Sequence, residues 1–316
     1  MSASKPTLWG LLSDTYVVIR SHFLHFLVLA AFFIFPSSIL SIIYPLFVPQ
    51  APSNLSLHQS LLFTTPSELH DEIPPTGDFQ FLIPFLFGLV ETLFYLCAIA
   101  SITYSTFGSL NGKPLKLILS LKSVLVSFLP LLATTVVLQL IYVLIVIAFV
   151  ILALLSYNAI SLMGFVMDYD TGYFLAFVML LSALLVLAIL YLQVKWFLAT
   201  VVVVLESKWG FEPLKRSTYL VKGMKGMVLS TILVLATPSF LLSFGFYRLI
   251  TSMSAGGISW SYAVLATLFS VIATMLQLFD VAAITVMYAY CKAWHGEDTS
   301  MIDEELGMGY AKLSAN

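Results

Sequence analysis

The chain has 316 residues, of which 60% are hydrophobic and only 9% are charged, and its net charge is −2. Soluble domains carry about 25% charged residues, so a soluble fold could not cover its own surface with polar groups. The composition therefore excludes a soluble enzyme or binding domain and predicts an integral membrane protein.

Six apolar stretches are long enough to cross a bilayer, whose hydrocarbon core requires about 20 apolar residues per helical span. None alternates as barrel strands do, and backbone polar groups in lipid must be satisfied internally. The sequence therefore predicts an all-α integral membrane protein with six transmembrane helices. The third stretch, about 48 Å long at about 1.5 Å per residue, predicts one tilted or protruding helix with Pro130 as a site for a kink. In chain order the stretches are Phe23–Val48, Phe81–Phe107, Val124–Leu155, Tyr173–Leu205, Met227–Ile250 and Trp260–Tyr290.

Positive charge is confined to one side of these spans. Of the 14 Lys and Arg residues, 13 flank or approach the same side and only Arg248 lies on the other. The positive-inside rule then predicts that both termini are cytosolic, in a protein of the endoplasmic reticulum, another endomembrane or the plasma membrane. The sequon at Asn54 lies in the first non-cytosolic loop, which makes it a candidate glycosylation site. The alternative is a sequon that occurs by chance.

An amphipathic segment precedes each odd-numbered span, and each of these spans contains a proline. The segments are Pro6–Arg20, Lys113–Lys122 and Pro213–Lys222, and the prolines are Pro36, Pro130 and Pro238. The recurrence favours three parallel units of interfacial helix plus helical hairpin, 1–107, 108–205 and 206–292. They would form a single polytopic domain, 1–316, with 293–316 as a short cytosolic tail.

One ionisable residue lies inside the second span of each predicted unit: Glu91, Lys195 and Asp280. A charge in mid-helix costs about 2.5–3.5 kcal/mol by insertion scales, so such residues face a partner or a wet cavity. One interpretation is an intramembrane polar cluster that relays protons or ions or binds a polar substrate. The other is a structural ion pair between Lys195 and either acid, or side chains that reach toward the headgroups.

A basic segment between the fourth and fifth spans is a candidate contact for anionic lipid headgroups. Its residues Lys215, Arg216, Lys222 and Lys225 would each contribute about 1 kcal/mol of attraction near an anionic surface. The alternative is that these charges serve only as the topological signal. Either interpretation makes membrane lipids the expected partners, together with other membrane proteins, and neither implies a nucleic acid.

The sequence contains no arrangement typical of catalysis or of a cofactor. It has no HExxH, GxSxG, P-loop or dinucleotide-binding fingerprint, so we expect no enzyme activity, cofactor or metal site. The cysteines Cys97 and Cys291 lie within or at the end of apolar spans, and no disulfide is predicted.

The C-terminal third contains four motifs: Val201–Gly210, then Leu214-Lys215-Arg216-Ser217 and Leu220-Val221-Lys222-Gly223, and the ending Tyr290–Glu297. In these motifs it resembles a family of plant multi-pass membrane proteins of uncharacterised function. The elbow is remotely similar to bacterial membrane domains associated with glycerophosphodiester phosphodiesterases. The resemblance implies an architecture and no catalytic residues. We expect no attached catalytic domain, so the phosphodiesterase activity does not carry over.

These observations predict a non-enzymatic membrane protein that organises the membrane or binds a lipid or protein partner. The alternative is a transporter or channel that uses Glu91, Lys195 and Asp280. An intramembrane enzyme would need a nucleophile and a base, and the sequence supplies no such pair.

Overall fold

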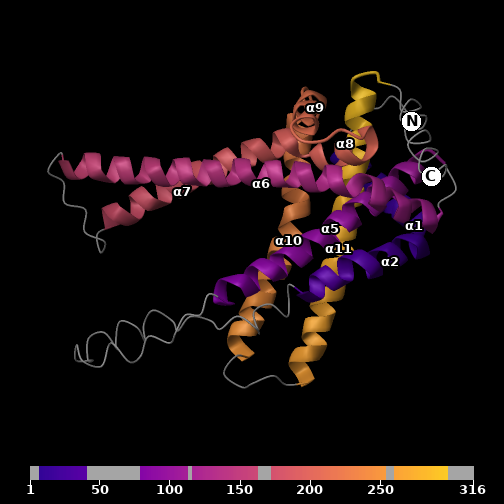
Figure 1. Ribbon diagram of the computed structural model, residues 1–316, viewed down its shortest axis with the longest axis horizontal. Helices are drawn as coiled ribbons and strands as arrows, with labels where there is room; N and C mark the ends of the chain where they lie inside the picture. Colours follow the sequence, from indigo (N-terminus) through magenta and orange to yellow (C-terminus); the bar gives the residue numbers. More distant parts are fainter. Residues whose placement is uncertain (1–6, 41–78, 113–115, 163–171, 254–259, 298–316) are drawn as a thin grey trace. The chain divides into compact units, whose positions relative to one another are not determined.

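The computed structural model describes residues 7–40, 79–112, 116–162, 172–253 and 260–297, and all regular structure in these residues is helical (Figure 1). Within them, six helical segments are long and apolar enough to cross a membrane. This confirms the predicted all-α class with six candidate transmembrane helices. The segments are Phe23–Leu40, Leu82–Leu110, Leu117–Ile160, Tyr173–Glu206, Lys225–Leu249 and Val264–Trp294.

The elements follow one another without strands in the described residues. In chain order they are α1 (Leu8–Ser21), α2 (Phe23–Leu29), the π-helical turn η1 (Ala30–Ile34), α5 (Phe79–Leu110), α6 (Leu117–Leu162), α7 (Gly172–Trp196), α8 (Ala199–Glu206), α9 (Glu212–Leu220), α10 (Lys225–Met253) and α11 (Trp260–Trp294). The chain divides into two compact units, each built from segments that are distant in sequence. The threefold division into 1–107, 108–205 and 206–292 stays a prediction.

The first unit comprises Met1–His22, Ile99–Ala236 and Phe279–Asn316. Small polar side chains line its helix contacts, as is common where membrane helices pack closely. The Ser105 and Ser120 hydroxyl oxygens lie 2.8 Å apart, and Ser123 donates to the carbonyl of Ala100 at 3.3 Å. Small residues and hydroxyl contacts therefore hold the start of α6 against the end of α5.

The second unit comprises Phe23–Ala98 and Thr237–Leu278. The turn η1 widens the first span, and the Ser37 hydroxyl donates to the carbonyl of Ile34 at 2.7 Å. The hydroxyls of Ser38 and of Thr274 in α11 lie 3.3 Å apart. Side-chain hydroxyls thus satisfy backbone and side-chain groups where the helix departs from regular α geometry.

Two predicted features take a different form in the structure. The segment Lys113–Lys122 is not a separate interfacial helix, because α6 already begins at Leu117 and continues through Pro130. With 46 residues, α6 is about 69 Å long at about 1.5 Å per residue. This exceeds a hydrocarbon core of about 30 Å by more than the sequence indicated, so α6 must tilt strongly or extend beyond the core.

Candidate functional site

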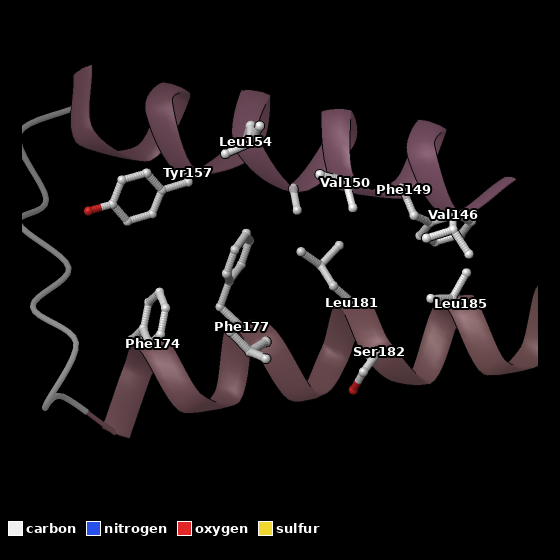
Figure 2. Close-up of a pocket in the computed structure, with 12 residues that line it drawn as sticks. Val146, Phe149, Val150, Leu154, Tyr157, Phe174, Phe177, Leu181, Ser182 and Leu185 are labelled. Carbon is white, nitrogen blue, oxygen red and sulfur yellow. The ribbon is translucent and has the colours of Figure 1, made fainter. Parts of the chain in front are cut away.

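An apolar pocket of about 450 Å³ lies between the C-terminal part of α6 and the N-terminal part of α7. Figure 2 shows Val150 of α6 and Phe177 and Leu181 of α7 directed into the space between the two helices. The lining is apolar except for Tyr157 and Ser182, and consists of Val146, Phe149, Val150, Ala153, Leu154, Tyr157, Phe174, Phe177, Val178, Leu181, Ser182 and Leu185.

The two polar residues of this pocket contribute little polarity to its interior. The Ser182 hydroxyl donates to the carbonyl of Met179 in its own helix at 2.9 Å, and Figure 2 shows it directed away from α6. The Tyr157 ring meets the Phe174 ring edge-on, with centroids 6.5 Å apart. Because buried water needs two to four polar partners, this pocket favours a hydrocarbon group over water.

A second site begins where the fourth span breaks between α7 and α8. The break at residues 197 and 198 interrupts an apolar run that the sequence predicts to be one helix. The Ser217 hydroxyl, from α9, fills the break: it accepts from the Leu198 amide at 3.1 Å and donates to the Lys195 carbonyl at 2.8 Å. One buried side chain therefore satisfies two backbone groups that the helix releases.

The chain then turns sharply between α8 and α9, a segment we call the elbow (residues 206–225, from the end of α8 to the start of α10). Ser207 and Gly210 both adopt positive φ angles, 49° and 70°, which reverse the chain after α8. The Gly210 amide donates to the Thr134 hydroxyl of α6 at 3.2 Å. This bond ties the elbow to the long helix.

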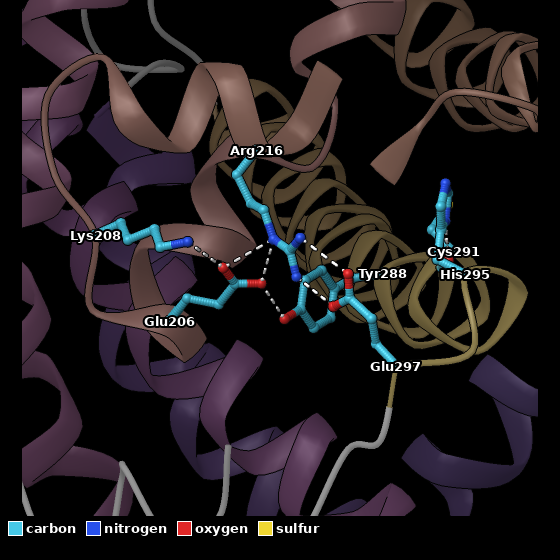
Figure 3. A network of polar contacts seen from close by, with 7 residues as sticks. All are labelled: Glu206, Lys208, Arg216, Tyr288, Cys291, His295 and Glu297. Carbon is cyan, nitrogen blue, oxygen red and sulfur yellow. Dashed lines mark hydrogen bonds and ion pairs between the residues drawn. The ribbon is translucent and has the colours of Figure 1, made fainter. Parts of the chain in front are cut away.

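The Glu206 carboxylate, at the end of α8, accepts hydrogen bonds from three residues (Figure 3). Arg216 Nε lies 3.1 Å from both carboxylate oxygens, Lys208 Nζ lies 3.0 Å from Oε2, and the Tyr288 hydroxyl donates to Oε1 at 2.9 Å. Only 8% of the Glu206 side chain is exposed. A charge this deeply placed requires such pairing, because an unpaired buried carboxylate is costly.

The Arg216 guanidinium uses its other edge to bind Glu297, just beyond α11. Nη1 donates to Glu297 Oε1 at 3.0 Å, and Nη2 pairs with Oε2. Gly296, at φ +68°, places Glu297 here: the Glu297 amide bonds the Lys292 carbonyl at 3.2 Å in a Schellman-type helix end. Arg216 therefore joins α8, α9 and the end of α11.

This pairing keeps Arg216 charged. Partial burial disfavours its charge, but the hydrogen bonds that it donates to Glu297 and Glu206 outweigh that cost and raise the pKa of the guanidinium above its ordinary value. The guanidinium also lies 5.6 Å from the Tyr219 ring centroid, and that ring packs against His295 at 5.0 Å. His295 Nδ1 lies 2.8 Å from the Cys291 carbonyl oxygen, and both residues are drawn in Figure 3.

The four predicted headgroup residues have different surroundings. Lys215, Lys222 and Lys225 are exposed on α9, after it and at the start of α10. Arg216 is partly buried, and its donors face two carboxylates. The headgroup hypothesis therefore depends chiefly on the three lysines.

The three intramembrane charged residues lie on three different helices. Glu91 is half-buried on α5 in the second unit. Lys195 Nζ lies 4.3 Å above the Tyr191 ring and, among the described residues, makes no ion pair with Asp280, which is half-buried on α11. That Glu91, Lys195 and Asp280 form one polar cluster stays a prediction. Asn54 lies outside the described residues.

Several residues of the elbow site were not identified from the sequence. The residues that were missed are Glu206, Tyr288 and Glu297. Of these, only Glu297 had a signal in the sequence, because Gly296 after a long apolar helix indicates a helix end. Nothing in the sequence pairs Ser217 with a helix break about 20 residues earlier. Within the described part of the chain, no three His, Cys, Asp or Glu side chains are placed to hold a metal ion.

The family described as "Domain of unknown function (DUF8558)" matches residues 6–313, nearly the whole chain. No curated protein and no solved structure matches the chain. The matched region includes both the pocket and the elbow.

Proposed function

We propose that this chain, which belongs to the DUF8558 family, is a non-enzymatic multi-pass membrane protein that holds a lipid acyl chain between α6 and α7. The observation that carries the proposal is the apolar pocket of about 450 Å³. Its volume lies in the range of about 300–1,000 Å³ that is typical of ligand sites. The family description names no activity, and the geometry of the pocket is what supports this function.

The surroundings of the pocket favour an acyl chain as its occupant. Both helices belong to candidate membrane spans, and many of their side chains outside the pocket, such as Leu152 and Leu184, are exposed and apolar. Lipid tails would therefore be the groups next to the pocket. Because tails are as apolar as leucine, binding would be driven by van der Waals fit rather than by the hydrophobic effect.

The test is photocrosslinking with a phospholipid that carries a diazirine on its acyl chain. In the purified protein, mass spectrometry should place the label on pocket residues such as Val150 and Phe177 in preference to outward-facing Leu152. Leu181→Trp, which fills the pocket, should reduce that labelling to background, whereas Leu184→Trp on the exposed face of the same helix should not. Uniform labelling along the hairpin in all three proteins would contradict the proposal.

The exposed lysines of the elbow supply a second lipid contact in this proposal. Lys215, Lys222 and Lys225 lie next to two candidate spans, where each would attract anionic headgroups by about 1 kcal/mol. A peptide covering 206–225 should bind anionic vesicles in a salt-sensitive manner and should not bind neutral vesicles. Equal partitioning into both would leave these charges with a topological role only.

The proposed orientation places both termini in the cytosol, in the endomembrane system or plasma membrane. It is supported by the distribution of Lys and Arg and by the resemblance to plant multi-pass proteins. Glycosylation of Asn54 and protease accessibility of both termini from the cytosolic side would agree with it. Termini on opposite sides would contradict it.

A transporter or channel is the second candidate function, and Asp280 favours it. Its side chain is half-buried within a candidate span, and among the described residues it makes no hydrogen bond or ion pair. Ionisable groups inside a membrane helix commonly mark ion or proton paths. Asp280→Asn and Lys195→Met should then abolish a pH- or ion-dependent flux in reconstituted vesicles at normal expression. Unchanged flux would exclude this role.

A further inference from the structure

The geometry of Arg216 is that of an anion site that already holds an anion from its own chain. The Nη1 and Nη2 donors face the two oxygens of Glu297 in a bidentate pair. A guanidinium fork presents the same geometry to a carboxylate and to a phosphate. The Glu297 carboxylate therefore occupies the position that a phosphate group would take.

The two carboxylates on Arg216 are held very differently. Glu206 is 8% exposed and receives donors from three residues, Arg216, Lys208 and Tyr288. Glu297 is 29% exposed, and within the described residues Arg216 is the partner of its carboxylate. Partly exposed ion pairs contribute little to stability. An exchange at Arg216 would therefore displace Glu297 and leave Glu206 in place.

The charge balance of the elbow also favours a second anion. Lys208 and Arg216 are neutralised by Glu206 and Glu297. If Glu297 moves away, this cluster gains one positive charge, next to the exposed Lys215, Lys222 and Lys225. The elbow lies between the ends of two candidate spans, where the phosphates of lipids are the expected anions.

We propose that the Nη edge of Arg216 is a binding site for the phosphate of an anionic lipid, and that Glu297 is its built-in competitor. The inference rests on the proposed contact between the elbow and anionic headgroups, and it adds the ligand group and the residue that regulates its access. Arg216 binds the phosphate in a bidentate manner, while Glu206 and Tyr288 hold the guanidinium in place. Glu297 lowers the affinity of the resting site.

The experiment is a titration of the purified full-length protein with dioctanoyl phosphatidic acid, dioctanoyl phosphatidylcholine or inorganic phosphate, followed by microscale thermophoresis. Glu297→Gln should raise the affinity for phosphatidic acid about two- to fivefold, the range set by a partly exposed pair. The matched control Glu212→Gln, an exposed carboxylate at the start of α9, should have no such effect. Arg216→Lys, which keeps the charge and removes the fork, should lower the affinity about tenfold and cancel the gain from Glu297→Gln.

Each outcome tests a different component of the proposal. Equal effects of Glu297→Gln and Glu212→Gln, or a gain that persists with Arg216→Lys, would overturn the inference while leaving the lysine contact intact. Phosphatidic acid that binds no better than phosphatidylcholine to any variant would refute the headgroup contact itself. Inorganic phosphate that binds Glu297→Gln as tightly as phosphatidic acid would overturn the assignment to a lipid. If Glu297→Gln does not fold, Glu297→Asp, with a shorter reach, should show a smaller gain.

Discussion

Replacing Ser217 by alanine should destabilise the protein, because its hydroxyl closes the break between α7 and α8. The side chain is fully buried, and its loss leaves the Leu198 amide and the Lys195 carbonyl without the bonds of 3.1 and 2.8 Å. Hydrogen bonds inside membrane proteins contribute about 0.6 kcal/mol on average and about 1.7 at most, and a buried unsatisfied group costs about 1–3 kcal/mol. For two bonds we expect a loss of about 1–3 kcal/mol.

The measurement is the thermal unfolding midpoint of the detergent-solubilised protein, followed by tryptophan fluorescence. At about 2 °C per kcal/mol for a chain of this size, Tm should fall by about 2–6 °C. Ser230→Ala, an exposed serine on α10, is the matched control and should leave Tm unchanged. Ser217→Cys, which keeps the volume with a weaker donor, should lie between the two. If Ser217→Ala unfolds at the same temperature as Ser230→Ala, the break does not depend on this hydroxyl and the reasoning is refuted.

Two further changes test the elbow and its contact with α11. Tyr288→Phe removes the 2.9 Å hydrogen bond to the ionised Glu206 and should cost about 1.5–3 kcal/mol, measured by thermal unfolding against the exposed Tyr247→Phe, which should cost nothing. Gly223→Ala should cost about 1–2 kcal/mol, because φ is +97° and a Cβ would lie 3.1 Å from Trp294 Nε1. Gly226→Ala, with open space around it in α10, should be neutral or stabilising by up to about 1 kcal/mol, and equal losses for both glycines would contradict the strain argument.

The number of spans and their helical character could be predicted from the sequence. Crossing hydrocarbon depends on the apolar content of a window of about 20 residues, which is a local property, and the six candidate spans confirm it. Two helix ends also depend on local residue type, since Gly210 and Gly296 adopt positive φ angles that favour glycine, but no turn was predicted there.

The elbow site was only partly accessible from the sequence. Lys215, Lys222 and Lys225 were recognised as surface charges, and they are exposed. Arg216 belongs to the same basic run, yet its neighbours in space are Glu206, ten residues earlier, and Glu297, 81 residues later. Composition cannot distinguish an arginine that faces headgroups from one that joins three helices.

The amino-acid sequence by itself determined that the chain forms six helices long and apolar enough to span a membrane, because apolar content acts over short stretches. Tertiary structure alone decided that the fourth span breaks before Ala199, that Arg216 is divided between two carboxylates, and that α6 and α7 leave a pocket between them. Hydrogen bonds and packing act between atoms a few ångströms apart, and the partners of these residues are set by how the helices pack.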